Sequence, residues 1–351
     1  MSVKASIVGA SGYVGGELLR ILAQHPRVEL KALTSRQHAG EYVHKVHPNL
    51  KGIVNAKFTG DDPVKAAADA DVVFLALPHK SSVNVVPELI NLGVKIIDMS
   101  ADFRLKSPEA YVKWYGYQHP HPELLEKFVY GLPELHREEL KGARYVSAPG
   151  CMAAASIISL APLVKKYTPS APVIVDAKIG SSGAGGKPSP STHFSERYGV
   201  VRPYKPTGHR HTGEIEQELS LVSGKKIEVA MSAHAVNMVR GILTTSHFIT
   251  DDELNLQDLW KAYREFYPSE PFVRFMMDRT GLYRFPDPKI VIGSNFADIG
   301  FDIDPHVKRV VVFGAIDNLI KGAAGSAVQS MNLMFGFNEK EGLNMAALHP
   351  V

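Results

Sequence analysis

The sequence predicts an α/β protein of two domains: a doubly wound parallel sheet, followed by an α+β domain with a mixed, largely antiparallel sheet. Three observations support this prediction. The chain has 351 residues, which exceeds the usual size of a single domain. Up to about residue 150, short apolar runs alternate with helical patterns, as in a parallel sheet. Further on, β-branched runs follow one another with few helices between them, which favours a mixed sheet.

The first predicted domain covers residues 1–150. It opens with a strand at Val3–Val8, a glycine turn, and a helix at Gly15–Gln24 whose leucines recur at helical spacing. The strands expected next are Val28–Thr34, Val72–Leu77 and Val94–Met99, with helices at Pro63–Ala68 and Ser82–Leu92. The segment Lys106–Arg144 is rich in aromatic residues and breaks this alternation, so we interpret it as an excursion near the cleft.

The second predicted domain covers residues 151–317 and begins after the turn Ser147–Gly150. An Ala-rich apolar run predicts a helix at Met152–Leu160, and a capped helix is expected at Asp251–Phe266. Strands are predicted at Val173–Ile179, Lys226–Ala233, Ile242–His247 and Val307–Ile316. A last helix at Gly325–Phe335 belongs to a C-terminal segment, residues 318–351, that we expect to pack back on the first domain.

Composition narrows the functional classes. Hydrophobic residues make up 45% and charged residues 21% of the chain, as in folded globular proteins. No apolar run approaches the roughly 20 residues of a membrane-spanning helix, and the N-terminus has no signal-peptide pattern, so we expect a soluble, cytoplasmic protein. The net charge is +3 and the basic residues are scattered, which argues against nucleic-acid binding and favours phosphates or an acidic partner protein.

A glycine-rich turn joins the first strand to the first helix. It reads Gly9-Ala10-Ser11-Gly12-Tyr13-Val14-Gly15. At such a place the N–H groups and the dipole of the helix can hold a pyrophosphate. Its spacing is GxxGxxG and not the common GxGxxG, so a purely structural turn is the alternative. We predict a Rossmann-type dinucleotide site, with the binding residues Gly9, Ser11, Gly12, Tyr13 and Val14.

The end of the second strand indicates which dinucleotide binds. Thr34, Ser35 and Arg36 stand where an NAD enzyme typically has an acidic residue for the ribose 2′-hydroxyl. A guanidinium and two hydroxyls suit a 2′-phosphate, so the predicted cofactor is NADP(H). The alternative is that Arg36 is only solvated.

Cys151 is the only cysteine, which excludes an internal disulfide. It follows Pro149-Gly150 and begins an apolar helix, where N–H groups and the helix dipole favour a thiolate. Its pKa should therefore lie below the ordinary value of about 8.5. A buried packing cysteine is the alternative. A thiolate beside a nicotinamide indicates thioester chemistry.

A polar cluster at Gly208–Glu214 contains two imidazoles, a guanidinium and a carboxylate. His209 or His211 can act as general acid and base, with Glu214 as the group that orients it. Two histidines and a carboxylate also form a possible zinc set, but no further pattern of ligand spacing supports a metal. A solvated helix start is the remaining alternative.

Three further segments are expected to complete the site. Pro78 follows a predicted parallel strand at the edge where ligands normally bind. Ser182 and Gly183 lie in a flexible strand exit, and Asn318 follows the last strand. All four are predicted to contact the cofactor.

These motifs together resemble the N-acetyl-γ-glutamyl-phosphate reductase family, which is allied to aspartate-semialdehyde dehydrogenase. The resemblance covers nearly the whole chain and is carried by ten ordered motifs. They are GASGYVGGELLR, LTSR, FLALPH, DMSADFRL, YGLPEL, SAPGC, SSGAGG, GHRHTGEIEQEL, VRGILTT and DNLIKGAAGSAVQSMNLMFG.

The resemblance implies an enzyme and its parts. The cysteine of the PGC turn, here Cys151, would be the nucleophile, and the histidines of the HRHT segment, here His209 and His211, would handle protons. The reaction implied is the NADPH-dependent reduction of an acyl phosphate to a semialdehyde, as in phosphorylating aldehyde dehydrogenases. The second domain would mediate homo-oligomerisation.

Residues 33–52, 189–212 and 233–245 are more similar to one branch of this family. That branch reduces an aminoadipyl or glutamyl phosphate carried on LysW, a small acidic amino-group carrier protein of lysine and arginine biosynthesis. A basic stretch around the proposed site fits an acidic carrier. It comprises Lys187, Arg197, Arg202, Lys205 and Arg210. The alternatives are a solvated basic loop and an ordinary N-acetyl-γ-glutamyl-phosphate reductase of arginine biosynthesis.

Two other classes of function explain less of the sequence. A metal-dependent hydrolase with His209, His211 and Glu214 as ligands would leave the dinucleotide turn unexplained. A non-catalytic NADP-sensing module has no use for a thiolate at a helix start.

Overall fold

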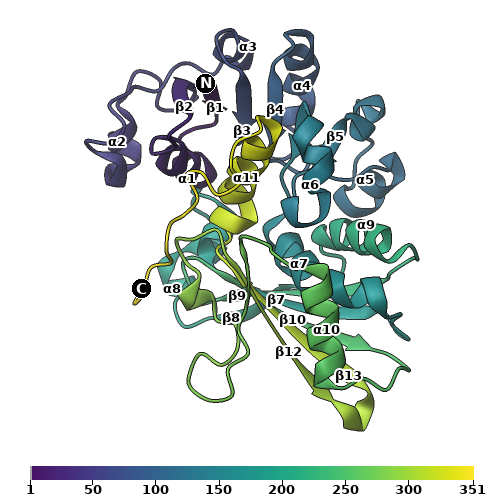
Figure 1. The fold of residues 1–351 in the computed structure, drawn as a ribbon. Helices are drawn as coiled ribbons and strands as arrows, with labels where there is room; N and C mark the ends of the chain where they lie inside the picture. Colours follow the sequence, from purple (N-terminus) through teal and green to yellow (C-terminus); the bar gives the residue numbers. More distant parts are fainter. Residues whose placement is uncertain (1) are drawn as a thin grey trace. The chain divides into compact units, whose positions relative to one another are not determined.

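The computed structural model describes residues 2–351, which form two compact units (Figure 1). Unit 1 consists of residues 2–111, 117–149 and 323–344, and unit 2 of residues 112–116, 150–322 and 345–351. Each unit is therefore assembled from segments that are distant in the sequence. No helix within residues 2–351 combines the length and the apolar character that crossing a bilayer requires.

Unit 1 is built on a six-stranded parallel sheet with the order β2-β1-β3-β4-β6-β5. Its strands are β1 (Val3–Val8), β2 (Val28–Leu33), β3 (Val72–Leu75), β4 (Lys95–Asp98), β5 (Phe128–Tyr130) and β6 (Tyr145–Ser147). Every residue of β3 is buried, as expected for an apolar strand at the centre of a parallel sheet. The loops that follow β1, β2 and β3 leave the same edge of the sheet, because parallel strands end together.

Helices of unit 1 come from both ends of the chain. They are α1 (Tyr13–Leu22), α2 (Val43–Val46), α3 (Pro63–Ala67), α4 (Ser82–Asn91), α6 (Pro133–Gly142) and α11 (Gly325–Met334), with 3-10 turns η1 (Pro48–Leu50) and η2 (Pro122–Lys127). Helix α1 buries Leu18, Leu19 and Leu22, which confirms the apolar spacing seen in the sequence. Helix α11 is buried along its whole length and packs against α1 and α6. The C-terminal helix is therefore part of the core of unit 1.

Unit 2 contains a seven-stranded mixed sheet with the order β11-β12-β13-β10-β7-β9-β8. Its strands are β7 (Val173–Ile179), β8 (Val201–Lys205), β9 (Val229–Val236), β10 (Ile242–Ile249), β11 (Val273–Phe275), β12 (Ala297–Asp304) and β13 (Arg309–Ile316). Four of the six pairings are antiparallel, and β7–β9 and β11–β12 are parallel. The predicted fold class, a parallel sheet and a mixed, largely antiparallel one, is confirmed.

Helices cover one face of the sheet of unit 2. The longer ones are α7 (Cys151–Lys166), α9 (His211–Ser223) and α10 (Leu256–Phe266). The short elements are η3 (Ser181–Ala184), η4 (Pro190–Thr192), α8 (Phe194–Arg197), η5 (Pro288–Ile290) and η6 (Pro305–Val307). The π-helix η7 (Ile320–Ala324) and helix α5 (Pro108–Tyr115) each contain residues of both units. Helix α7 packs on β10, β13 and α9. The buried Tyr263 and Tyr267 join α10 to α7, because their hydroxyls donate to the Ser159 carbonyl (2.6 Å) and the Ile158 carbonyl (2.9 Å).

Some elements differ from the sequence-based expectation. Strands β5, β6, β8, β11 and β12 were not predicted. Strands β5, β6 and β11 are only three residues long, too short to show a pattern, and β8 contains Pro203 and is mostly exposed. Helix α7 continues past the predicted end at Leu160 and includes Pro162. Helix α10 begins at Leu256 and not at Asp251, because the Asn255 side chain caps it by accepting two backbone N–H bonds.

Burial predicts which isoleucines stabilise unit 2. Ile157 of α7 is fully buried, so Ile157→Ala should lower the free energy of unfolding by about 2–5 kcal/mol through lost apolar contact and a cavity. Ile174 of β7 is 41% exposed, so the matched change Ile174→Ala should cost less than about 1 kcal/mol. Urea unfolding followed by circular dichroism measures both. Equal losses would contradict the assignment of the core.

Candidate active site

Cys151 is the first residue of α7, and Gly150 is the residue that precedes the helix in extended conformation. A Cβ at Gly150 would lie 2.6 Å from His211 Nε2 and 2.8 Å from Glu214 Oε1. Only glycine therefore fits at this position. The helix geometry gives the first amide N–H groups of α7 no partner within the helix. These groups can stabilise a thiolate or an oxyanion beside Cys151.

A second glycine approaches Cys151 from another element. Gly322 lies in the π-helix η7, and a Cβ at Gly322 would be 2.6 Å from the Cβ of Cys151. π-helical turns are frequent at functional sites. Cys151 is only partly exposed, with glycine backbone on both sides. Neither glycine can be exchanged without displacing the cysteine or its neighbours.

Glu214 ties α9 to the start of α7. Its side chain is fully buried, and Oε2 accepts the Gly150 N–H at 2.8 Å. Oε1 accepts a long hydrogen bond from the Tyr115 hydroxyl at 3.4 Å and lies 4.0 Å from His211 Nε2. Cys151, His211 and Glu214, which are predicted as catalytic residues, are thus brought together within unit 2.

His209 is buried just before α9 and is held in one orientation. Its Nδ1 accepts the backbone N–H of His211 at 3.1 Å, so the proton of the neutral ring sits on Nε2, which lies 3.5 Å from the Tyr204 hydroxyl. The two imidazoles are 4.7 Å apart and nearly perpendicular. Burial, together with the charges of Arg210 and Lys205, lowers the pKa of His209 to about 4. His209 is therefore neutral at physiological pH.

Two tyrosines at this site were not among the predicted residues. Tyr204 of β8 is half-exposed, but its hydroxyl reaches His209 and lies 4.0 Å from the sulfur of Met152. Burial and the negative charge of a nearby Cys151 thiolate raise the pKa of Tyr204 to about 12. Tyr115, together with Trp114, comes from the segment that the sequence marked only as aromatic. Gly213 makes room for it, because a Cβ there would lie 2.5 Å from the Trp114 ring.

The glycine turn of unit 1 fits a dinucleotide. Gly9 has φ +83°, and a Cβ there would lie 2.4 Å from the Ala76 carbonyl oxygen. Gly15 is equally confined, with a Cβ position 2.6 Å from the Gly9 carbonyl oxygen. At Gly12, in contrast, a Cβ would make only an ordinary contact, 3.7 Å from the Gly9 carbonyl oxygen, and this residue precedes α1, whose first residues are Tyr13 and Val14. The turn therefore packs tightly against the sheet and leaves the N-terminus of α1 open to a phosphate.

The end of β2 lies beside this turn, as the sequence predicts. Thr34 Oγ1 accepts the Gly9 N–H at 3.2 Å, and the Ser11 and Ser35 hydroxyls are 2.8 Å apart. Arg36 extends into solvent next to them and is 86% exposed. Hydroxyls and an exposed guanidinium at this corner suit a ribose or its phosphate.

Pro78 is exposed in the loop after β3, at the same edge of the sheet. The loop is held by the one that follows β4, because the Lys80 N–H donates to Asp102 Oδ1 at 2.7 Å and the Ala101 N–H donates to His79 Nδ1 at 2.9 Å. Lys80 has φ +68°, which is unusual for a residue other than glycine. Asp102 thus fixes a strained loop at the edge of the sheet where the parallel strands end.

Ser182, Gly183 and Asn318 are brought together in unit 2. The Asn318 side chain donates to Ser182 Oγ at 3.0 Å and accepts the Gly241 N–H at 2.8 Å. A Cβ at Gly183 would lie 2.4 Å from the Ile179 side chain. Asn318 therefore joins two strand ends, and its predicted contact with the cofactor stays a prediction.

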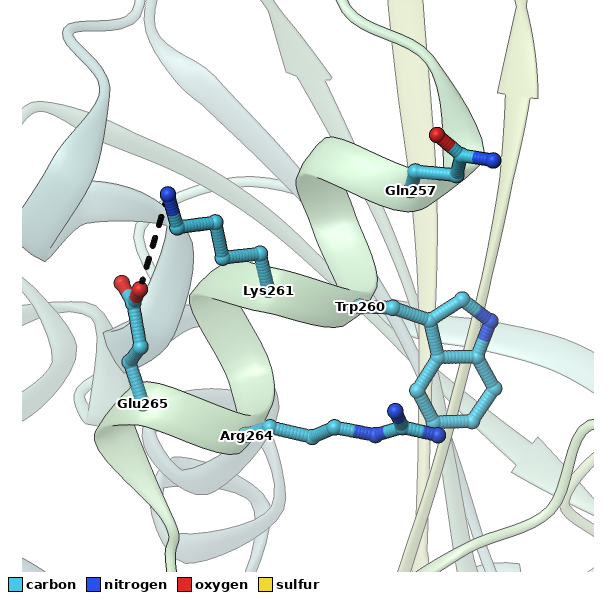
Figure 2. A pocket seen from close by; sticks show the side chains of 5 residues that line it. All are labelled: Gln257, Trp260, Lys261, Arg264 and Glu265. Carbon is cyan, nitrogen blue, oxygen red and sulfur yellow. Dashed lines mark ion pairs between the residues drawn. The ribbon is translucent and has the colours of Figure 1, made fainter.

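A separate surface hollow of about 530 Å³ lies on α10 (Figure 2). Its five lining residues, Gln257, Trp260, Lys261, Arg264 and Glu265, all belong to this helix. The Arg264 guanidinium lies over the Trp260 ring at 4.9 Å, and Lys261 is 3.9 Å from Glu265. The hollow contains none of the predicted site residues. Within residues 2–351, no group of three or more His, Cys, Asp or Glu side chains is placed to hold a metal ion.

Comparisons with known proteins agree with this architecture. Residues 4–143 match the model of the semialdehyde dehydrogenase NAD-binding domain, and residues 151–318 match that of the semialdehyde dehydrogenase dimerisation domain. The chain has 16% identity and a TM-score of 0.71 to aspartate semialdehyde dehydrogenase II of Vibrio cholerae, with 96% of this chain and 99% of that chain covered. This similarity extends to the fold alone.

Curated relatives are much more similar in sequence. A protein of Saccharolobus solfataricus, named as a reductase of LysW-linked L-2-aminoadipate phosphate and L-glutamate phosphate, is 50% identical over 99% of both chains. A protein of Picrophilus torridus with the same activity in its name is 55% identical over 99% of this chain and its own full length. One from Nitrosopumilus maritimus is 54% identical over 99% of this chain.

The buried, neutral His209 should make stability depend on pH. Its pKa is about 4 in the folded protein against an ordinary 6.5, so the unfolded chain takes up this proton first as the pH falls. The contribution of the neutral His209 ring to the free energy of unfolding is present above pH 6.5 and is lost as the pH falls towards 4. Between pH 7.5 and 4.5, wild type should lose about 2–3 kcal/mol of unfolding free energy more than His209→Gln. Parallel pH profiles for the two proteins, measured by urea unfolding, would contradict the low pKa.

Proposed function

Because the chain belongs to the semialdehyde dehydrogenase family, we propose that it reduces an aminoadipyl or glutamyl phosphate carried on LysW to the semialdehyde, with NADPH as reductant. The chain is an oxidoreductase with a domain for a nicotinamide cofactor. The observation that carries the proposal is Cys151 at the first position of α7, beside His211 and Glu214, in a chain with full-length relatives of this named activity.

The first half of the proposed reaction is acyl transfer. The Cys151 thiolate bonds to the acyl carbon, the bond from that carbon to the phosphate oxygen breaks, and inorganic phosphate leaves with the electron pair. The first N–H groups of α7 stabilise both the thiolate and the oxyanion of the tetrahedral intermediate. The product of this step is a thioester on Cys151.

In the second half, a bound nicotinamide would supply the hydride that reduces the thioester carbon; the C–S bond then breaks, its electron pair returns to the Cys151 sulfur, and the semialdehyde leaves. We assign proton transfer to His211, because its Nε2 lies at the Gly150 backbone and near Glu214, directly before the nucleophile. His209 is the positioning residue, since its Nδ1 is bound to the His211 N–H and its pKa is about 4. Glu214 orients His211 and holds the start of α7.

We propose NADP(H) as the cofactor because Arg36, Ser35 and Ser11 gather beside the glycine turn, where their hydroxyls and guanidinium could bind a 2′-phosphate. Tyr13 and Val14 would hold the pyrophosphate with backbone N–H groups at the start of α1, Gly9 and Gly12 would let it approach the turn, and Thr34 fixes the turn by accepting the Gly9 N–H. Pro78, Ser182, Gly183 and Asn318 remain candidates for contacts at the nicotinamide end.

The basic stretch supports a carrier-linked substrate. In the structure, some of its residues are exposed and others have structural partners. Lys187, Lys205 and Arg210 are exposed. Arg197 donates to the Ile179 carbonyl at 2.8 Å, and Arg202 lies 3.7 Å from Glu196, so both have structural partners. The three exposed cations are therefore the ones available to an acidic carrier. The alternative substrate is free N-acetyl-γ-glutamyl phosphate.

We also propose that unit 2 forms a homo-oligomer. One face of its sheet is only half-buried, and it carries Leu243 of β10 and Val311 and Phe313 of β13, which alternate with buried residues along their strands. Hydrophobic residues on such a face are typical of an interface. Sedimentation equilibrium tests this, and a monomer at micromolar concentration would contradict it.

Changing Cys151 to Ser should abolish turnover, by about a thousandfold or more, because a serine hydroxyl at this position has no comparable nucleophile character. Cofactor binding, measured by fluorescence titration, should stay within a few fold. Since Cys151 is the only cysteine, mass spectrometry of the wild-type enzyme with acyl phosphate should show one acyl adduct, on this residue. Normal turnover by the serine variant would refute the mechanism.

The carrier-linked reaction should depend on ionic strength. We expect kcat/KM for LysW-linked substrate to fall between low and physiological salt, and to fall by about tenfold more in Lys187→Glu/Lys205→Glu. The matched variant Lys165→Glu/Lys225→Glu has the same change in net charge outside the stretch, and should have little effect. Efficient reduction of N-acetyl-γ-glutamyl phosphate with no carrier preference and no salt effect would favour the alternative enzyme.

A further inference from the structure

Asp61 lies beside the end of β2, because backbone hydrogen bonds join the segment that contains it to this strand end. The Thr59 N–H donates to the Leu33 carbonyl at 2.9 Å, and the Ser35 N–H donates to the Thr59 carbonyl at 3.1 Å. Thr34 and Thr59 form a parallel bridge. Asp61 follows two residues later, so it reaches the proposed 2′-phosphate corner from a segment other than β2 itself.

The Asp61 carboxylate contacts the side chain to which we assign the 2′-phosphate. Arg36 Nε donates to Asp61 Oδ2 at 2.9 Å. Arg36 is 86% exposed, whereas the Asp61 side chain is 24% exposed and therefore lies deeper. The bond uses Nε and leaves the terminal guanidinium nitrogens to a ligand. A phosphate bound there would stand within several ångströms of a fixed negative charge.

We propose that Asp61 is a specificity-determining residue that limits the preference for the 2′-phosphorylated cofactor, an inference that rests on the proposed role of Arg36. Its charge offsets part of the attraction of Arg36 for the phosphate and repels the phosphate directly. A carboxylate at this corner is also the group that accepts the 2′-hydroxyl of a cofactor without the phosphate. The enzyme therefore uses NADPH with a moderate advantage and retains activity with NADH.

The substitution Asp61→Asn isolates the charge, because asparagine keeps an oxygen that can accept from Arg36 Nε. The matched control is Asp62→Asn, since the Asp62 side chain caps α3 by accepting the Lys65 N–H and asparagine caps a helix equally well. The ligands are adenosine 2′,5′-bisphosphate and adenosine 5′-monophosphate, which differ only in the 2′-phosphate, and calorimetry measures their affinities.

In Asp61→Asn, the affinity for the bisphosphate should rise by about three- to tenfold, while the affinity for the monophosphate changes less than twofold. The gain should shrink at high salt, because both charges are near solvent. The ratio of the KM values for NADH and NADPH should rise by a similar factor. Asp62→Asn should leave all of these values unchanged.

Two outcomes separate this inference from the proposed function. If wild type prefers the bisphosphate, Arg36→Ala removes that preference, and Asp61→Asn changes neither affinity, Asp61 only forms a surface ion pair and the inference is overturned. An equal change for both ligands overturns it too. If wild type binds the two ligands equally well and Arg36→Ala changes nothing, the assignment of NADP itself fails.

Discussion

The hydrogen bond from the Gly150 N–H to Glu214 is the constraint on which the candidate active site depends. A fully buried carboxylate is costly unless it is hydrogen-bonded, and Glu214 meets this requirement through the backbone that precedes Cys151. The same bond aligns the first turn of α9 with the start of α7, which places His211 against Gly150. A side chain at residue 150 would prevent this approach. The packing of α9 against α7 and the assembly of the proposed catalytic residues therefore depend on the same hydrogen bond.

Two polar rings near Cys151, those of His209 and Tyr204, have pKa values that burial moves away from neutral pH. His209 has a pKa of about 4 and Tyr204 a pKa of about 12, so at neutral pH neither ring carries a charge. His209 and Tyr204 can therefore accept and donate hydrogen bonds. Because they are uncharged, they do not compete with a thiolate for a positively charged partner. Arg210 and Lys205, whose charges act on His209, are exposed and belong to the surface that we propose for an acidic carrier. The interior of the site is polar, while its formal positive charge lies outside.

The parts of the protein that sequence reasoning identified are those encoded over short distances. Strands β1 and β7 begin and end at the predicted residues, because each is one continuous run. His211 and Glu214 lie three residues apart on one helical turn, which the spacing itself indicates. Tyr115 reaches Glu214 across 99 residues, and Asp61 reaches Arg36 across 25, so no local pattern marks either contact. Tyr204 lies on an exposed edge strand that contains a proline, so no periodic pattern of neighbouring residues indicates its position at the site.

The division of the chain into units has a consequence for its synthesis. The chain passes from one unit to the other five times, and the buried helix α11 is made near the end. Its packing partners α1 and α6 leave the ribosome long before it. Until α11 is synthesised, the apolar surface that it covers is exposed, so unit 1 completes its core only when translation is nearly finished. Incompletely folded chains that expose apolar surface are prone to aggregate, so unit 1 carries this risk until synthesis is nearly complete.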